Sequence, residues 1–118
     1  MADDSTVPSS DVLELARAWL AAEPDGDIHA ELSALIDAAE AGDADAAADL
    51  LRRFDGRLQF GTAGLRAAVA AGPMRMNRLS VRQAAAGLGQ WLLDQEAAGV
   101  IERAAERGVV IAHDARRK

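Results

Sequence analysis

The sequence predicts an α/β protein, with a helical N-terminal leader followed by an incomplete domain built on a mixed, mostly parallel sheet. The first half carries apolar residues at helical spacing, interrupted by Asp and Gly. The second half places a β-branched run, residues 109–112, after a long amphipathic helix, which is typical of a βαβ crossover. The length of 118 residues suits one domain or part of one. We divide the chain into an acidic helical segment, 1–54, and the first part of an α/β domain, 55–118.

Composition limits the core and several classes of function. Hydrophobic residues make up 50% of the chain, but 28 of them are Ala, so the core must be modest. The absence of Cys excludes disulfides, thiolate metal sites and thiol nucleophiles. No apolar run approaches the roughly 18–20 residues that cross a bilayer, and the N-terminus lacks the pattern of a secretory signal. We therefore expect a cytoplasmic chain with no membrane partner.

Charge is divided unevenly along the chain. Residues 1–51 carry 13 acidic side chains and one basic one, whereas residues 52–118 carry 6 acidic and 12 basic ones, of which 11 are Arg. The acidic half argues against nucleic acid as a partner of the whole chain. The basic half could bind an anion, because the guanidinium group pairs with phosphate or carboxylate oxygens. Solvated arginines are the simpler interpretation, and charge alone leaves both open.

Three short helices are predicted before residue 55. Ser10 or Asp11 can cap the first, Asp27 the second and Asp43 the third. We expect the apolar stripe of each helix to enter the core. The stripes are Val12, Leu15, Ala16, Trp19 and Leu20; Leu32, Leu35, Ile36 and Ala39; and Ala47, Leu50, Leu51 and Phe54.

The clustered aspartates of this half do not predict a metal site. They lack the ligand spacing, the sixth-position Gly and the final Glu of a calcium loop. Carboxylates in a first helical turn are explained by the favourable field at the helix N-terminus. The aspartates are Asp25, Asp27, Asp43, Asp45 and Asp49.

The second half should alternate strands and helices. Residues 67–70 could form a short strand before the turn at Gly72 and Pro73. Ser80 and Gln83 match a capping box, and the helix behind them should bury Trp91 and end near Gly99. Residues 101–107 have a helical pattern, and residues 109–112 a buried-strand pattern. Because an incomplete sheet leaves strand edges uncovered, we expect fraying at 109–118.

The segment 61–66 is the one most suited to binding. Gly61 and Gly64 allow positive φ and a close approach of the backbone to a ligand, and amides in such a turn can form an anion-binding nest. Thr62 adds a hydroxyl and Arg66 a fixed positive charge. The same spacing also marks ordinary turns, so residue pattern alone leaves a phosphate site and a plain turn both open.

Four further polar residues are candidates for supporting roles. Arg75 and Asn77 could line a cleft or simply fix the turn before the helix, and the second is favoured. Asp114 and Arg116 should share one side of a strand, where an ion pair could brace a neighbouring loop. His113 points to the opposite face from Asp114, so the two are not expected to form an acid–base dyad.

The motifs of the second half closely resemble the opening of the α-D-phosphohexomutases, the phosphoglucomutases and phosphomannomutases. The resemblance runs from about Leu13 to Arg116, and the acidic leader is similar to that of the longer phospho-sugar mutase branch. The motifs are Phe60-Gly61-Thr62-Ala63-Gly64-Leu65-Arg66, Gly72-Pro73, Arg75-Met76-Asn77, Val81 with Ala84, Gly87 and Leu88, Val109-Val110-Ile111, and Asp114-Ala115-Arg116.

This resemblance implies an isomerase that transfers a phosphoryl group between C1 and C6 of a hexose phosphate. The family has four domains, the first three being α/β/α units, and works through a phosphoserine and a sugar 1,6-bisphosphate. Three aspartates of its second domain hold Mg²⁺. Its Gly-Thr-Ala-Gly-Leu-Arg loop lies in the cleft, which makes Arg66 the expected phosphate contact, with Thr62, Gly61 and Gly64 supporting it. Arg75, Asn77, Asp114 and Arg116 would support the cleft.

The chain also departs from the family pattern. None of its serines stands in a Thr-Ala-Ser-His-Asn-Pro-like loop, and the metal loop is absent, so we expect no catalytic residue or metal ligand here. We interpret the chain as an N-terminal fragment of domain I that is inactive alone. Glycines common in the family are replaced by Ala67, Ala70 and Ala112, and its usual Asn by Met74.

One rival interpretation belongs to a different functional class. The chain could be a non-catalytic, Ala-rich helical interaction module in which Gly61 to Gly64 is a plain turn. An RNA-binding Gly-x-x-Gly loop is a weaker form of this idea, because Thr62 and Ala63 lack basic charge. The sequence indicates neither the preferred sugar phosphate nor the oligomeric state.

Overall fold

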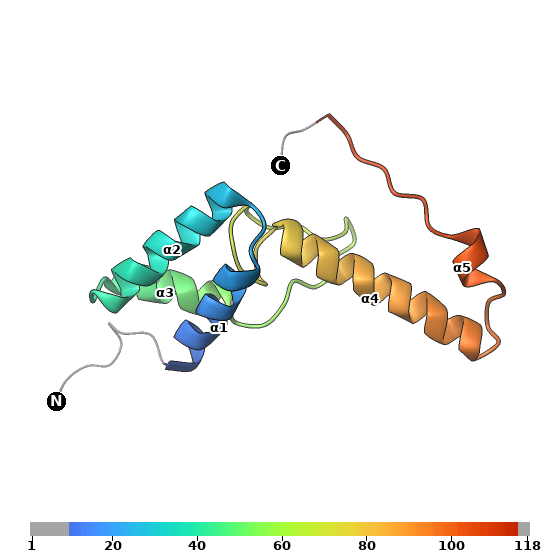
Figure 1. Ribbon diagram of the computed structural model, residues 1–118, viewed down its shortest axis with the longest axis horizontal. Helices are drawn as coiled ribbons and strands as arrows, with labels where there is room; N and C mark the ends of the chain where they lie inside the picture. The colour runs from blue at the N-terminus through green and yellow to red at the C-terminus, as the bar shows by residue number, and fades with distance from the viewer. Residues whose placement is uncertain (1–9, 116–118) are drawn as a thin grey trace. The chain divides into compact units, whose positions relative to one another are not determined.

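The computed structural model describes residues 10–115 and is mostly helical (Figure 1). Its helices are α1 (Ser10–Ala22), α2 (Gly26–Glu40), α3 (Ala44–Arg53), α4 (Arg78–Ala97) and α5 (Ala104–Arg107). Packing divides the chain into two compact units, Met1–Ser80 and Val81–Lys118. The predicted domain division after Phe54 stays a prediction, because compact units of a short chain need not coincide with domains of a longer one.

Helices α1, α2 and α3 pack together as the helical leader, with α2 in contact with both neighbours. Its buried side chains repeat at helical spacing, which confirms most of the predicted stripes. Leu32 and Leu50 are fully buried. The prediction is wrong for Leu15 and Leu51, which are more than half exposed because each lies just outside the inward-facing arc. The core comprises Val12, Ala16, Ile28, Leu32, Ile36, Ala39, Ala46, Ala47, Leu50, Phe54 and Ala71.

Aspartate side chains cap two leader helices. Asp43 Oδ1 accepts hydrogen bonds from the amides of Asp45 and Ala46, as predicted. Asp25, rather than the predicted Asp27, caps α2 by accepting from the amides of Asp27 and Ile28. Asp25 takes the cap because its backbone is extended, with φ −90° and ψ 119°, so the helix begins two residues sooner than predicted.

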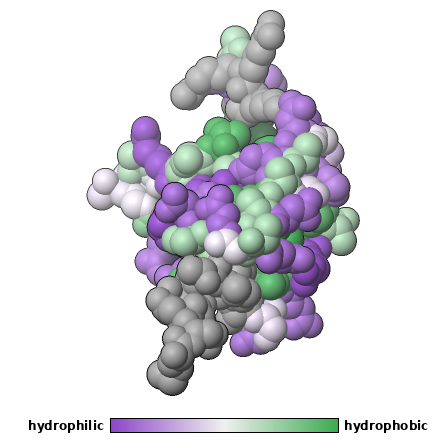
Figure 2. Space-filling view, turned by 90° about the vertical axis from the view of Figure 1, so that its left-hand side faces the viewer, coloured by the Kyte–Doolittle hydropathy of each residue, from purple (hydrophilic) through white to green (hydrophobic). Residues whose placement is uncertain are grey.

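Polar and small apolar residues share the exposed surface of the leader. On the face drawn in Figure 2, hydrophilic and hydrophobic areas are interspersed. Trp19 is half-buried: its ring packs edge-to-face on Phe54, with centroids 6.1 Å apart, and its Nε1 donates to Glu23 Oε2 at 3.0 Å. This arrangement confirms Trp19 as a core-facing residue whose polar atom is satisfied.

The segment between α3 and α4 folds against the leader instead of forming a strand. Ala71 is fully buried in the leader core. The predicted strand at 67–70 is reduced to one bridge between Val69 and Met76, with Met76 N donating to Ala68 O at 2.9 Å. A short Ala-rich run has little side-chain surface to stabilise a ladder, and it finds only this one partner within residues 10–115.

Helix α4 leaves its apolar side uncovered within the second unit. Trp91, predicted to be core, is 55% exposed, and Val81 and Leu88 are about as exposed. The helix ends at Ala97, and Gly99 follows with φ +78°, close to the predicted end. The predicted helix at 101–107 shortens to the single turn of α5.

The expected parallel sheet is not formed in the described part of the chain. Residues 109–112 are extended but belong to no strand, and Val110 and Ile111 are 95% and 86% exposed. A strand needs a hydrogen-bonding neighbour, and no segment within residues 10–115 supplies one. None of the helices described is long and apolar enough to cross a membrane.

Candidate functional site

The Gly61–Gly64 segment is a closed two-residue turn. The amide of Gly61 donates to Gly64 O at 3.0 Å, and the amide of Gly64 donates to Gly61 O at 3.1 Å. Gly64 has φ +90°, a conformation that glycine adopts without strain. The two glycine amides are therefore paired inside the turn, so the glycines shape the loop and do not themselves form an anion nest.

The side-chain donors that remain for a ligand in this segment are those of Thr62 and Arg66. Both residues are exposed. No carboxylate or carbonyl group among the described residues binds the Arg66 guanidinium. The loop thus exposes a fixed positive charge and, four residues before it, a hydroxyl, which are donors suited to phosphate oxygens.

The turn is held at both flanks by residues 73–77. Leu58 N donates to Pro73 O at 3.2 Å on the N-terminal side. On the C-terminal side, Met76 N donates to Ala68 O, and Ala70 N donates to Met76 O at 3.2 Å. The position of the Gly61–Arg66 loop therefore depends on the segment 71–77, which we call the anchor turn.

Asn77 organises the anchor turn and starts α4. Its Nδ2 donates to the carbonyls of Ala70 (2.8 Å), Gly72 (2.9 Å) and Arg75 (3.3 Å), and its Oδ1 accepts from Ser80 N at 2.8 Å. Asn77 is buried, so these bonds replace the ones water would make. These four hydrogen bonds fix the turn, as the favoured prediction for Asn77 requires, and its expected support of a cleft stays a prediction.

Ser80 therefore does not play its predicted part as the helix cap. It lies in the first turn of α4, and its hydroxyl donates to Arg75 O at 2.9 Å. Asn77 takes the capping position because its amide group can accept from the helix and donate to the anchor turn at once. Asn and Ser are about equally common at this position, so the sequence does not distinguish Asn77 from Ser80 as the cap.

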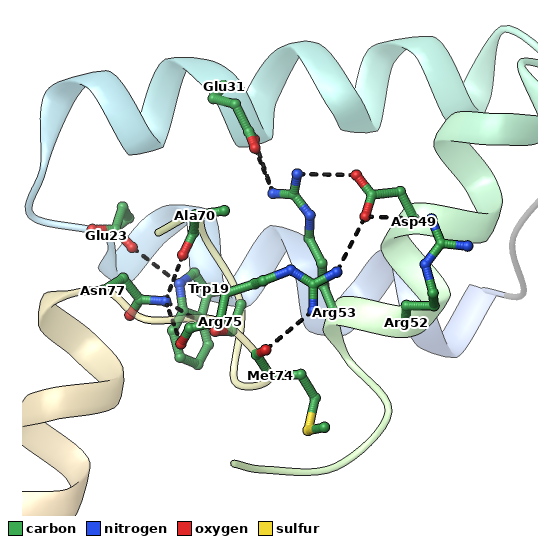
Figure 3. Close-up of polar contacts among 11 residues, drawn as sticks. Trp19, Glu23, Glu31, Asp49, Arg52, Arg53, Ala70, Met74, Arg75 and Asn77 are labelled. Carbon is green, nitrogen blue, oxygen red and sulfur yellow. Dashed lines mark hydrogen bonds and ion pairs between the residues drawn. The ribbon is translucent and has the colours of Figure 1, made fainter. Parts of the chain in front are cut away.

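Arg75 is engaged with the leader. Its Nη1 donates to Met74 O at 3.1 Å, and its Nη2 lies 3.5 Å from Asp49 Oδ1 on α3 (Figure 3). The Arg75 side chain is only 21% exposed. This geometry favours the predicted turn-fixing role over a cleft-lining one.

Asp49 is shared with a second, more deeply buried arginine. Arg53 Nη2 donates to Asp49 Oδ2 at 3.0 Å, and Arg53 Nη1 donates to Glu31 Oε2 at 2.9 Å, so the guanidinium bridges α2 and α3 (Figure 3). We call Glu31, Asp49, Arg53 and Arg75 the charge clamp. The spacing of Asp49 and Arg53 on one helix face could have suggested their pairing from sequence. Glu31 and Arg75 are too distant from Asp49 and Arg53 in the sequence for any local pattern to predict that the four residues meet.

Burial and ion pairing oppose each other at Arg53. Desolvation alone would lower the pKa of the Arg53 guanidinium, but its hydrogen bonds and ion pairs with Asp49 and Glu31 outweigh this and raise the pKa above its ordinary value. Arg53 Nε is buried without a hydrogen-bond partner among the described residues. Arg53 therefore stays charged and held in place at every ordinary pH.

The C-terminal candidates are only partly described. Asp114 is exposed, and the Nδ1 atom of His113 lies 2.8 Å from the carbonyl oxygen of Asp114. Arg116 lies outside the described residues, so its expected ion pair with Asp114 stays a prediction. Within residues 10–115, no three His, Asp or Glu side chains are grouped so as to hold a metal ion.

Sequence comparison relates the chain to phosphosugar mutases. A probable phosphoribomutase of Schizosaccharomyces pombe is 39% identical over 105 residues, which are 89% of this chain and 16% of the relative. A phosphopentomutase of Mus musculus is 43% identical over 68 residues, 58% of this chain and 10% of the relative. A phosphoglucomutase of Staphylococcus saprophyticus is 51% identical over 39 residues, 33% of this chain and 7% of the relative.

These relatives are phosphomutases of one broad kind, and phosphomutases are isomerases. The chain spans 16% or less of the length of each of the three. No protein-family model and no solved structure matches the chain.

Proposed function

We propose that the chain is the N-terminal part of a phosphohexomutase, a phosphoglucomutase or phosphomannomutase of the longer phospho-sugar mutase branch. The observation that carries the proposal is the closed Gly61–Gly64 turn with Arg66 exposed and unpaired among the described residues, in a chain whose relatives are phosphosugar mutases. In this role Arg66 binds a phosphate of the substrate, and Thr62 donates a further hydrogen bond.

The proposed reaction transfers a negatively charged phosphoryl group, so a fixed positive charge beside the substrate would assist it. A phosphoserine gives its phosphoryl group to the free C6 hydroxyl of a hexose 1-phosphate, and the serine then recovers the C1 phosphoryl group from the resulting 1,6-bisphosphate. Enzymes assist phosphoryl transfer mainly by positioning and charge neutralisation. In the proposal Arg66 binds the phosphate group that is not being transferred, and so holds the reacting end of the sugar next to the phosphoserine.

The remaining machinery lies outside these 118 residues in this proposal. Mg²⁺ would neutralise charge on the transferring group, but none of the described residues forms a set that could hold it. The phosphoserine would likewise come from sequence not present here, and we expect the 118-residue chain alone to give no turnover of glucose 1-phosphate. Residues 109–112 would pair as a strand of an α/β/α domain once neighbouring strands were present. A cytoplasmic location and the lack of nucleic acid partners are parts of the same proposal.

A pentose phosphate is a second candidate substrate. It is favoured because one matched relative is named a probable phosphoribomutase and another a phosphopentomutase. Both candidates require the same phosphate contact at Arg66. In a longer protein containing this chain, the ratio of kcat/KM for ribose 1-phosphate to that for glucose 1-phosphate would decide between them.

The phosphate role of Arg66 can be tested on the chain itself by NMR titration with glucose 1,6-bisphosphate. We expect amide shifts concentrated at 61–66 and about tenfold weaker binding in Arg66→Ala, the loss typical of one charge-assisted hydrogen bond. Arg57→Ala is the matched control, because Arg57 is exposed and lies outside the turn. Equal loss in both variants, or no shift at 61–66, would contradict the phosphate site.

The rival interaction-module interpretation is tested on the same sample. Stronger binding of single-stranded RNA than of the bisphosphate would favour that module. The coding sequence downstream of Lys118 offers an independent check, because an in-frame Thr-Ala-Ser-His-Asn-Pro loop would establish the family.

A further inference from the structure

The charge clamp connects the leader to the Gly61–Arg66 loop through a continuous series of contacts. Its first link is backbone to backbone: Met74 N donates to Arg53 O at 3.0 Å. Gly72 lies so close that a β-carbon there would stand 3.0 Å from Arg53 Cβ and 3.1 Å from Arg53 O. The last residue of α3 therefore packs directly against the anchor turn.

The second link is the shared carboxylate of Asp49. One oxygen pairs with Arg53 at 3.0 Å and the other with Arg75 at 3.5 Å, so the anchor turn is held by charge as well as by backbone contact. Arg53 in turn reaches Glu31 on α2, with an N–O distance of 2.6 Å to Oε1. The Arg53 side chain is only 9% exposed, which limits screening by solvent ions.

The third link joins the anchor turn to the loop. Apart from the Gly61–Gly64 pair, the hydrogen bonds made by the backbone of residues 57–70 among the described residues go to residues 73–77. The loop has no other backbone support there. Its placement is thus set by the anchor turn, and the placement of the anchor turn by α3.

We infer that Asp49 and Arg75 are positioning residues that hold the Gly61–Arg66 loop in its binding orientation, so that the acidic leader acts as the support of the site. The inference deepens the proposed function and rests on it for the identity of the ligand. It assigns Arg75 to the support of the loop rather than to direct contact with phosphate.

The test compares Arg75→Gln with Arg52→Gln in the 118-residue chain. Arg52 is a matched control, because its Nη2 lies 3.9 Å from the same Asp49 oxygen while its side chain is 66% exposed. Among the described residues, Arg52 makes no side-chain hydrogen bond or ion pair with the anchor turn. We expect hydrogen exchange at the amides of Leu58, Gly61 and Gly64 to accelerate about fivefold in Arg75→Gln, as loss of a partly buried ion pair allows. Exchange at Leu32 and Leu50 in the leader core should not change, and Arg52→Gln should resemble the wild type.

A double-mutant cycle separates positioning from direct ligand contact. If Arg75 acts through Asp49, Arg75→Gln should weaken glucose 1,6-bisphosphate binding by about fivefold. Asp49→Asn, which also loses the Arg53 pair, should weaken binding at least as much, and the double variant should bind no more weakly than Asp49→Asn alone. Arg75→Lys, which keeps the charge, should recover most of the affinity. Additive losses would mean that Arg75 contacts the ligand itself, and would overturn the inference.

Failure of the inference is distinguishable from failure of the proposed function. If the wild type binds no sugar bisphosphate, the phosphate role of Arg66 fails, yet the exchange rates at 58–64 still report whether the clamp orders the loop. If binding occurs but exchange at those amides is the same in Arg75→Gln and Arg52→Gln, the positioning role fails alone.

Discussion

At the scale of single residues, Gly72 is a position where an added β-carbon would not fit. Gly72 combines φ +112° with direct contact to the backbone of Arg53. Gly64 has a similar backbone, φ +90°, but nothing lies within 4 Å of where its β-carbon would be. The two glycines therefore share a conformational requirement and differ in packing.

This difference gives a residue-level prediction. Gly72→Ala should lower the free energy of unfolding by about 2–4 kcal/mol, the sum of backbone strain and overpacking against Arg53. Gly64→Ala should cost only about 1–2 kcal/mol, from strain alone. Urea denaturation followed by circular dichroism would measure both. Equal losses would mean that the close contact between Gly72 and Arg53 contributes nothing.

At the scale of elements, local periodicity predicts the helices well and their ends less well. The stripe of α2 is buried as expected because a helix fixes which residues share a face. The caps at Asp25 and Asn77 differ from the predicted Asp27 and Ser80, since each true cap has a competitor two or three residues away. What decides at Asn77 is the position of the Ala70, Gly72 and Arg75 carbonyls, which accept from its Nδ2 and which local sequence does not place.

Asn77 both caps α4 and donates to carbonyls around the anchor turn, and a substitution that keeps only the capping role can test this. Asp caps helices as well as Asn does, so Asn77→Asp should leave the start of α4 intact. It removes the Nδ2 donors and places a carboxylate against the carbonyls of Ala70 and Gly72, so we expect a loss of about 2–3 kcal/mol in unfolding free energy. Thermal denaturation would measure it. An unchanged melting temperature would show that Asn77 is a helix cap and nothing more.

The same reasoning explains which site residues could be predicted. Arg66, Thr62 and the two glycines form a contiguous motif, so sequence alone points to them, although their ligand role stays a prediction. The charge clamp joins residues from α2, α3 and the anchor turn, and only the folded leader brings Glu31, Asp49 and Arg75 to one place.

At the scale of the whole molecule, burial is concentrated in the first compact unit. Among the residues described, every buried hydrophobic residue of the core lies between Val12 and Ala71. The sequence pattern of 109–112 is that of a buried strand, yet these residues are exposed because sheet formation is a property of neighbouring strands, not of one segment. The strand prediction fails for this reason, while the helix predictions, which need only local bonds, largely hold.

Amide hydrogen exchange should follow this division along the chain. Amides of α2 and α3 around Leu32 and Leu50 should exchange slowest, at rates set by global unfolding, because they sit in the only buried cluster among residues 10–115. Amides of α4 should show intermediate protection, since its hydrogen bonds are formed but its apolar side is uncovered. Residues 109–112 should exchange at close to the rate of an unstructured peptide. Strong protection at 109–112 in the isolated chain would mean that these residues do pair, either within the molecule or with a second copy. A dilution series of the same measurement would tell the two apart, because only pairing between copies is lost as the protein is diluted.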